Sequence, residues 1–210
     1  MKLYQSNGSP NSRRIRILIA EKGLDVELVS VDLGAKEQFS DAYRAINPRV
    51  VVPALVLEDG TAIGEVPVIQ RYLDETYPTV PLLGVTPTEK AIIGMWDRRV
   101  ELEGFASVME AIRNTVPGLK DRAIAGPHGY QQIPALIDRS KKRVANFYAD
   151  LDARLREVSF VAGENFSVAD ITALVTVDFA ANAISMPVPK DAVEVRRWYE
   201  VVSAKPSVAA

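Results

Sequence analysis

A proline inside a run of strand-forming residues gives this chain its clearest opportunity for hydrogen bonding to a ligand. Residues 50–52 and 54–57 are apolar, Pro53 separates them, and the turn sequence Glu-Asp-Gly-Thr follows at 58–61. Because proline has no N–H to donate to a ladder, it marks an edge, a bulge or a bend. If the peptide bond before Pro53 is cis, the backbone of Val52 turns outward. We therefore expect the backbone of Val52, held in place by Pro53, to pair with an extended, peptide-like ligand as one strand pairs with another.

A second group of polar residues lies near the start of the chain. Residues 6–12, Ser-Asn-Gly-Ser-Pro-Asn-Ser, are turn formers and helix caps, and apolar residues at helical spacing follow them. Ser9, Asn11 and Ser12 therefore lie at a junction between a loop and a helix. Each of the three has two roles open to it: a plain helix cap, or a polar group that contacts a ligand.

The composition excludes several classes of function. The chain has 210 residues, a formal net charge of -2 and no run of like charges, so nothing points to nucleic acid or to an anionic membrane surface. Without cysteine there is no disulfide, no thiolate metal site and no thiol nucleophile. The single histidine, His128, lies in a Gly-Pro-His-Gly loop with no second imidazole nearby, so we expect no metal. No signal peptide or membrane-spanning stretch is recognisable, and we expect a cytoplasmic protein.

The N-terminal part of the chain alternates between strand and helix patterns. The predicted elements are a strand at 1–5, a helix that ends at Gly23, a strand at 26–31, a weak helix at 39–46, the two hairpin strands and a helix at 66–77. The first two strands are expected to be parallel, because a helix connects them. This segment positions both polar groups described above.

The remainder of the chain is predicted to be helical. Residues 77–87 hold three prolines and no periodicity, which indicates a linker. Amphipathic patterns then predict long helices over 88–114 and 133–158 and a last helix over 191–204. Ser167 and Asp170 form a capping box before a nearly all-apolar helix, which should be central to the second core.

Taken together, these features resemble a cytosolic glutathione S-transferase over essentially the whole chain. The resemblance is carried by the order of elements, Val-Val-Pro-Ala-Leu at 51–55, the Asp-Gly turn, Gly-Glu at 64–65, the proline-rich linker and the Ser-Val-Ala-Asp box at 167–170. It implies a thioredoxin-like α/β domain at 1–78 that binds glutathione, a linker at 79–87, and an all-α domain at 88–210 with the acceptor site. It also implies conjugation of glutathione to a small hydrophobic electrophile, a role in detoxification, and a homodimer.

The resemblance assigns the catalytic role to Ser9. The thiol of glutathione is mostly protonated at pH 7, so the enzyme must stabilise the thiolate, and a donor at a helix N-terminus does so. Ser9 matches the serine of the serine-type families, and we predict that its hydroxyl donates to the thiolate. Asn11 and Ser12 are the rivals for this contact and are expected among the residues that bind glutathione.

Other positions match the glutathione-binding residues of the family. Val52, before Pro53, matches the residue whose N–H and C=O pair with the cysteinyl part of the tripeptide. Glu65 matches the acidic residue near the γ-glutamyl end, and the amide of Val66 can donate there from a helix N-terminus. Gln38 falls near the position that meets the glycyl end.

Three valines depart from the family pattern and leave alternatives open. Val66 stands where a serine or threonine is usual, and Val50 and Val51 replace the usual glycine and lysine. The loss of one hydroxyl bond to a carboxylate could weaken glutathione binding about tenfold or more. One alternative is therefore a glutathione-transferase-like binding protein without conjugating activity. Another is a glutathione-dependent isomerase, dehalogenase or ether-cleaving enzyme on the same fold, because an apolar acceptor site has no reactive signature.

Overall fold

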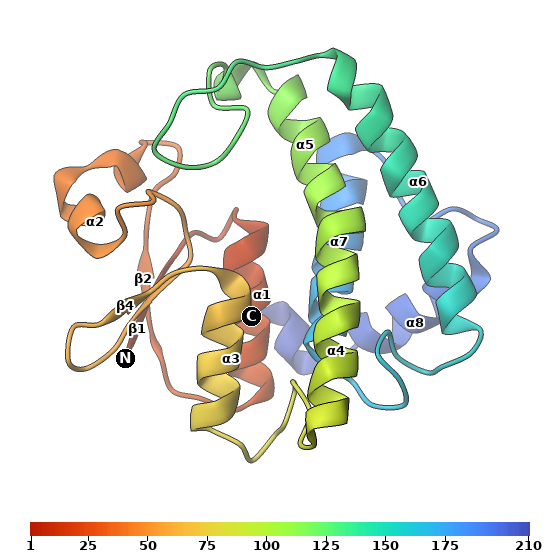
Figure 1. Ribbon diagram of the computed structural model, residues 1–210. Coiled ribbons are helices and arrows are strands. Elements are labelled where there is room, and N and C mark those ends of the chain that lie inside the picture. The colour runs from red at the N-terminus through yellow and green to blue at the C-terminus, as the bar shows by residue number, and fades with distance from the viewer. The chain divides into compact units, whose positions relative to one another are not determined.

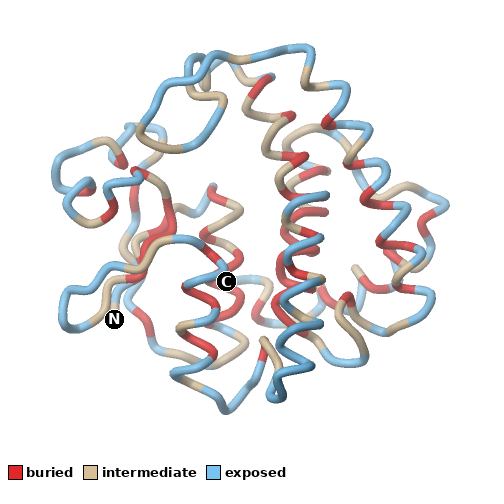
Figure 2. Tube along the Cα trace, in the orientation of Figure 1, coloured by how far each residue is buried: buried red, intermediate tan, exposed pale blue.

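The computed structural model describes residues 1–210 and divides the chain into two compact units (Figure 1). The first unit comprises residues 1–80 together with 125–128 and 209–210. The second comprises residues 81–124 and 129–208. Each unit has its own buried residues, shown in red in Figure 2.

The first unit is built on a four-stranded sheet. Its strands are β1 (Lys2–Gln5), β2 (Glu27–Ser30), β3 (Ala54–Val56) and β4 (Ala62–Ile63), in the order β2-β1-β3-β4. Strand β1 is parallel to β2, whereas β3 is antiparallel to both β1 and β4. The helices are α1 (Pro10–Glu21), η1 (Glu37–Phe39), α2 (Asp41–Ile46) and α3 (Val66–Thr76). The predicted order of elements is confirmed.

The hairpin differs from the prediction at one end. Residues 50–52 lie outside the ladder, and the hairpin consists only of β3 and β4. Val50 adopts a left-handed backbone with φ 51°, which breaks the extended run, and Pro53 has no N–H to continue it. The apolar character of these valines therefore reflects burial and not strand pairing.

Helices α1 and α3 pack side by side in this unit (Figure 1). Their contact includes a buried ion pair between the ends of the two helices, where Lys22 Nζ lies 2.6 Å from Asp74 Oδ1. The same ammonium group donates to the carbonyl of Val80 at 2.5 Å. Lys22 therefore ties the start of the linker to both helices.

The second unit is helical. Its elements are α4 (Pro87–Arg99), the π-helical segment η2 (Val100–Phe105), α5 (Ala106–Thr115), η3 (Pro117–Leu119), α6 (Ala135–Leu155), α7 (Val168–Ile184), α8 (Val193–Ser203) and η4 (Pro206–Ala209). Helix α7 is buried along most of its length, as its nearly all-apolar sequence predicts. None of the helices combines the length and the apolar character that crossing a bilayer requires.

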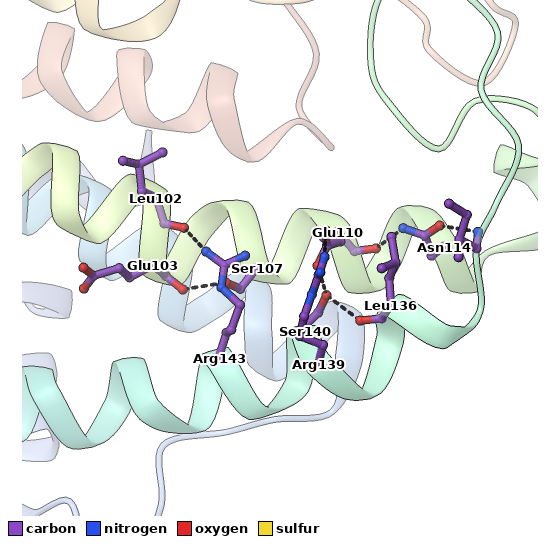
Figure 3. Close-up of polar contacts among 10 residues, drawn as sticks. Leu102, Glu103, Ser107, Glu110, Asn114, Leu136, Arg139, Ser140 and Arg143 are labelled. Carbon is purple, nitrogen blue, oxygen red and sulfur yellow. Dashed lines mark hydrogen bonds and ion pairs between the residues drawn. The ribbon is translucent and has the colours of Figure 1, made fainter.

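The long helix predicted over 88–114 is present, but η2 interrupts its regular hydrogen bonding. At this point Gly104 faces Phe147 of α6 so closely that an added Cβ would lie 2.9 Å from the ring. Arg143 of α6 donates to the carbonyl of Leu102 at 2.6 Å, and the Ser107 hydroxyl donates to the carbonyl of Glu103 at 2.6 Å (Figure 3). The π-helical segment is therefore supported by polar contacts from α5 and α6.

The capping box predicted before α7 is confirmed. The Asp170 carboxylate accepts from the Ser167 N–H at 2.9 Å and from the Ser167 hydroxyl at 3.1 Å. It also accepts from the Val161 N–H and from the indole N–H of Trp198, both at 2.9 Å. The box thus joins the start of α7 to the preceding loop and to α8.

Candidate functional site

Helix α1 begins at Ser9, which is its N-cap. The Ser9 Oγ accepts a hydrogen bond from the Ser12 N–H at 3.2 Å, and Pro10 occupies the first helical turn. The hydroxyl of Ser9 donates to no group of the protein, and the residue is 8% exposed. Ser9 therefore serves as a helix cap and still has its O–H to offer to an anion at the helix start.

The two rivals of Ser9 have different surroundings. Ser12 is completely buried, and its Oγ accepts from the N–H of Ser6 at 3.3 Å. Asn11 is partly exposed, and its Oδ1 accepts from Arg14 Nη1 at 3.4 Å. Ser12 thus holds the loop in place from beneath, whereas Ser9 lies nearer the surface.

The loop before Ser9 is held by two residues that the sequence analysis did not identify. Arg16 Nη1 donates to Gln5 Oε1 at 2.7 Å and to the carbonyl of Ser6 at 3.4 Å, and Gln5 Nε2 donates to Asn7 Oδ1 at 3.0 Å. Burial, together with the neighbouring Arg13, lowers the pKa of Arg16. The signal was an arginine flanked by Ile15 and Ile17 in an apolar stretch, since a buried arginine must have acceptors nearby.

The backbone at Val52 is the second part of the site. The Val52–Pro53 peptide bond is cis, and neither the N–H nor the C=O of Val52 takes part in a hydrogen bond of the protein. The preceding carbonyl, that of Val51, accepts from the Tyr43 hydroxyl at 2.7 Å and from Asn47 Nδ2 at 2.8 Å. Burial raises the pKa of Tyr43 to about 12, although the side chain of Asn47 lowers it in part, so Tyr43 remains a donor at neutral pH.

The start of α3 forms a third part. Glu65 has φ 65°, an uncommon backbone conformation for a residue other than glycine, and its exposed carboxylate has no hydrogen bond or ion pair with the protein. Val66 follows with a backbone N–H that has no acceptor, and Pro67 has no N–H at all. The Val66 N–H is therefore a free donor beside a free carboxylate.

Gln38 contributes one more polar group. It lies in η1, is 7% exposed, and its buried Oε1 has no hydrogen-bond partner. A buried polar atom without a partner is uncommon in a folded protein and calls for an explanation such as a ligand or a water molecule.

The strand register brings three of these segments to one edge of the sheet. Gln5 at the end of β1 pairs with Ser30 at the end of β2, so the chain leaves both strands on the same side. Tyr4 pairs with Ala54, the first residue of the antiparallel β3, so Val52 enters the sheet from that side. Leu55 pairs with Ile63, the last residue of β4, so the turn into α3 begins there too. This edge therefore holds the loop that leads to Ser9, the backbone of Val52 and the start of α3 at Glu65.

No group of three or more histidine, aspartate or glutamate side chains in the structure is arranged to hold a metal ion. The polar atoms gathered at this edge are the Ser9 hydroxyl, the backbone groups of Val52 and Val66, and the Glu65 carboxylate. Such a set is suited to a zwitterionic peptide and includes only one carboxylate for a cation.

Comparison with known proteins assigns both parts of the chain to related domain families. Residues 3–81 match the family described as the glutathione S-transferase N-terminal domain, and residues 134–200 match the glutathione S-transferase C-terminal domain. Glutathione S-transferase 2 of Saccharomyces cerevisiae is 36% identical over 213 residues, covering 99% of this chain and 88% of the relative.

Solved structures agree over the full length. The crystal structure of Gtt2 from Saccharomyces cerevisiae has a TM-score of 0.90 and 34% identity, and the match covers 100% of this chain and 99% of the other. A glutathione S-transferase domain-containing protein from Marinobacter aquaeolei VT8 has a TM-score of 0.91 and 34% identity, covering 99% of this chain and 100% of the other. The predicted architecture, an α/β thioredoxin-like domain followed by an all-α domain, is confirmed by these matches.

Proposed function

Because the chain belongs to the glutathione S-transferase family, we propose that it conjugates the thiolate of glutathione to small apolar electrophiles and that Ser9 stabilises this thiolate. Members of the family use glutathione as co-substrate. The observation that carries the proposal is the Ser9 hydroxyl, which caps α1 with its oxygen and has a hydrogen left to donate. A hydroxyl donor at the positive end of a helix lowers the pKa of a thiol that binds there.

We assign roles to the other residues of the same edge from the chemistry of their polar groups. The free N–H and C=O of Val52, next to Pro53, suit the main chain of the cysteinyl residue, as one strand pairs with another. The free carboxylate of Glu65 suits the ammonium group of the γ-glutamyl residue, and the Val66 N–H suits its carboxylate.

Three further residues complete the proposed binding set. The carboxamide of Gln38 suits the glycyl end, because its Nε2 can donate to the glycyl carboxylate and its unpartnered Oε1 can accept from the glycyl N–H. Asn11 is exposed enough to contact the tripeptide, whereas Ser12 acts from beneath through the loop. The proposal also includes the division of the chain into a glutathione-binding domain at 1–78, a linker at 79–87 and an all-helical domain at 88–210 with the acceptor site. It further includes a homodimer, a cytoplasmic location and a role in detoxification.

The role of Ser9 is tested by Ser9→Ala. Loss of one charge-assisted hydrogen bond should lower kcat roughly tenfold to a hundredfold, while the Kd of glutathione from calorimetry changes little. Because the bound thiol would then have a higher pKa, the acidic limb of the kcat/KM profile should move to higher pH. If Ser9→Ala left kcat unchanged and Ser12→Ala abolished it without unfolding the protein, the thiolate contact would belong to Ser12.

One observation favours a second candidate, a protein that binds glutathione weakly or another ligand and does not catalyse conjugation. Val66 is 5% exposed and has no hydroxyl to add to its backbone N–H, and Val50 and Val51 also depart from the usual residues. Calorimetry with millimolar glutathione separates the two candidates. Binding without turnover of any aryl halide or epoxide would favour the second candidate and would direct tests toward glutathione-dependent isomerase, dehalogenase and ether-cleaving reactions.

A further inference from the structure

The carbonyl of Val51 accepts two hydrogen bonds from side chains that are almost completely buried. The Tyr43 hydroxyl lies 2.7 Å from it and Asn47 Nδ2 lies 2.8 Å from it. Tyr43 is 3% exposed and Asn47 is 6% exposed. Both donors come from α2 and its C-terminal cap, so one short helix fixes the peptide plane between Val51 and Val52.

Asn47 also closes the loop in which this carbonyl lies. Its Oδ1 accepts from the N–H of Arg49 at 3.0 Å, and its carbonyl accepts from the N–H of Val50 at 2.9 Å. Its own N–H donates to the carbonyl of Tyr43 at 2.8 Å. The left-handed conformation of Val50, a β-branched residue that rarely adopts it, is therefore held within a closed set of hydrogen bonds.

Tyr43 also fixes Val52, the residue that follows Val51, through packing. Its ring belongs to a buried apolar cluster with Val31 and Val52, and Tyr4, Leu33 and Ile46 pack against that cluster. The side chain of Val52 is thus fixed in the interior while its N–H and C=O remain without partners in the protein. A backbone segment held in this way loses little conformational entropy when a ligand pairs with it.

We propose that Tyr43 and Asn47 are positioning residues for glutathione, because their shared hydrogen bonds to the Val51 carbonyl fix the orientation of the Val52 backbone. The inference rests on the proposed function, in which Val52 pairs with the cysteinyl residue. Both side chains are buried and donate to the Val51 carbonyl, so they act on the ligand only through the Val52 backbone. The loss of either donor therefore weakens glutathione binding and leaves the chemical step intact.

The test compares Tyr43→Phe with wild type and with the matched control Tyr4→Phe. Tyr43→Phe keeps the ring and removes only the hydroxyl, whereas the hydroxyl of Tyr4, whose ring lies edge-on to Tyr43 with centroids 6.3 Å apart, makes no hydrogen bond to the protein. From the usual worth of one neutral hydrogen bond, the KM and Kd for glutathione should rise roughly three- to tenfold in Tyr43→Phe. Its kcat at saturating glutathione and the KM of the electrophile should stay at the wild-type values. Tyr4→Phe should match wild type in all four quantities.

Asn47→Asp provides a second variant that removes the donor and keeps the acceptor for the Arg49 N–H. It should raise the Kd of glutathione at least as much as Tyr43→Phe does, while circular dichroism and gel filtration confirm that it is folded. Hydrogen exchange of the Val50 amide, which donates to the Asn47 carbonyl, should be faster in both variants than in wild type. If wild type binds glutathione and both folded variants bind it equally well, the inference is wrong while the proposed function stands. If wild type binds no glutathione, the proposed function fails, and this inference fails with it.

Discussion

The indole N–H of Trp198 on α8 donates to the carboxylate of Asp170 at the start of α7 over 2.9 Å, and both residues are completely buried. The same carboxylate accepts from the Ser167 N–H, the Ser167 hydroxyl and the Val161 N–H. A single side chain therefore satisfies donors from a helix start, a loop and a second helix. This arrangement makes Asp170 central to the helical unit.

Replacing Asp170 with alanine should destabilise the protein strongly without affecting the thiol chemistry. Each buried donor left without an acceptor costs about 1–3 kcal/mol, so Asp170→Ala should lower the free energy of unfolding by about 3 kcal/mol or more. Trp198→Phe removes one of the donors and part of the packing and should cost less. Urea unfolding measures both changes. A fall in kcat of Asp170→Ala at an unchanged free energy of unfolding would contradict the structural role.

The free energy of unfolding should depend on pH through the buried carboxyl of Asp170. Burial raises the pKa of Asp170 to about 6, although the hydrogen bonds it accepts lower it in part. The folded chain therefore binds a proton in a range where the unfolded chain has lost it, and this contribution to stability is lost as pH rises from about 4 through about 6. Over this pH range the contribution of Asp170 to the free energy of unfolding should fall by about 3 kcal/mol in total. Asp170→Asn, which cannot titrate, is the reference.

The measurement is the difference between the unfolding free energies of wild type and Asp170→Asn at several pH values. This difference removes the contributions of groups that titrate in both proteins. It should decrease as pH rises to about 6 and change little at higher pH, because burial raises the pKa of Asp170 in the folded protein. A difference that is constant or increases with pH would show that the carboxyl titrates at or below its ordinary range in the folded protein.

Gly104 should tolerate no larger residue in the π-helical segment. A Cβ at this position would lie 2.9 Å from the ring of Phe147, a buried side chain that has little room to move. Overpacking costs about 1–3 kcal/mol, which exceeds the gain of about 1 kcal/mol from replacing a helical glycine with alanine. We therefore expect Gly104→Ala to lower the free energy of unfolding.

Gly94 on the same long helix provides the matched control for Gly104. It is exposed, and a Cβ there would meet nothing within 4 Å, so Gly94→Ala should stabilise the protein by about 0.5–1 kcal/mol. Combining Gly104→Ala with Phe147→Leu should cost less than the sum of the two single changes, because the smaller side chain makes room. Strict additivity would show that the ring does not limit position 104.

The order of elements could be predicted from the sequence because each signal was local. Gly23 has φ 62° after the end of α1, and Ser167 and Asp170 form the capping box that their spacing indicates. Val50 misled the prediction of a strand, since β-branched residues favour strands and only the fold places this one in a left-handed turn. The π-helical segment was also hidden, because its apolar spacing differs little from that of an ordinary helix.

The candidate site could be predicted only in part. A cap sequence locates Ser9, Asn11 and Ser12 at a helix start, but only the folded loop shows that Ser12 is completely buried while Ser9 is nearer the surface. Arg16 and Tyr43 act on the site through contacts with residues that are 8 or more positions away in the chain. Contacts of this kind depend on the tertiary structure and leave no spacing pattern in the sequence.

Restoring a hydroxyl at the start of α3 should strengthen the binding of glutathione. Val66→Ser would add a donor beside the free N–H of the same residue, and one hydrogen bond to a carboxylate is worth about 1.5–3 kcal/mol, which corresponds to a tenfold or larger decrease in Kd. The loss of buried apolar surface should lower the free energy of unfolding by about 1–2 kcal/mol. Val66→Ala is the control, because it loses the same surface without gaining a donor. Calorimetry with glutathione measures the Kd of both variants, and equal values would show that the γ-glutamyl carboxylate does not bind at this helix start.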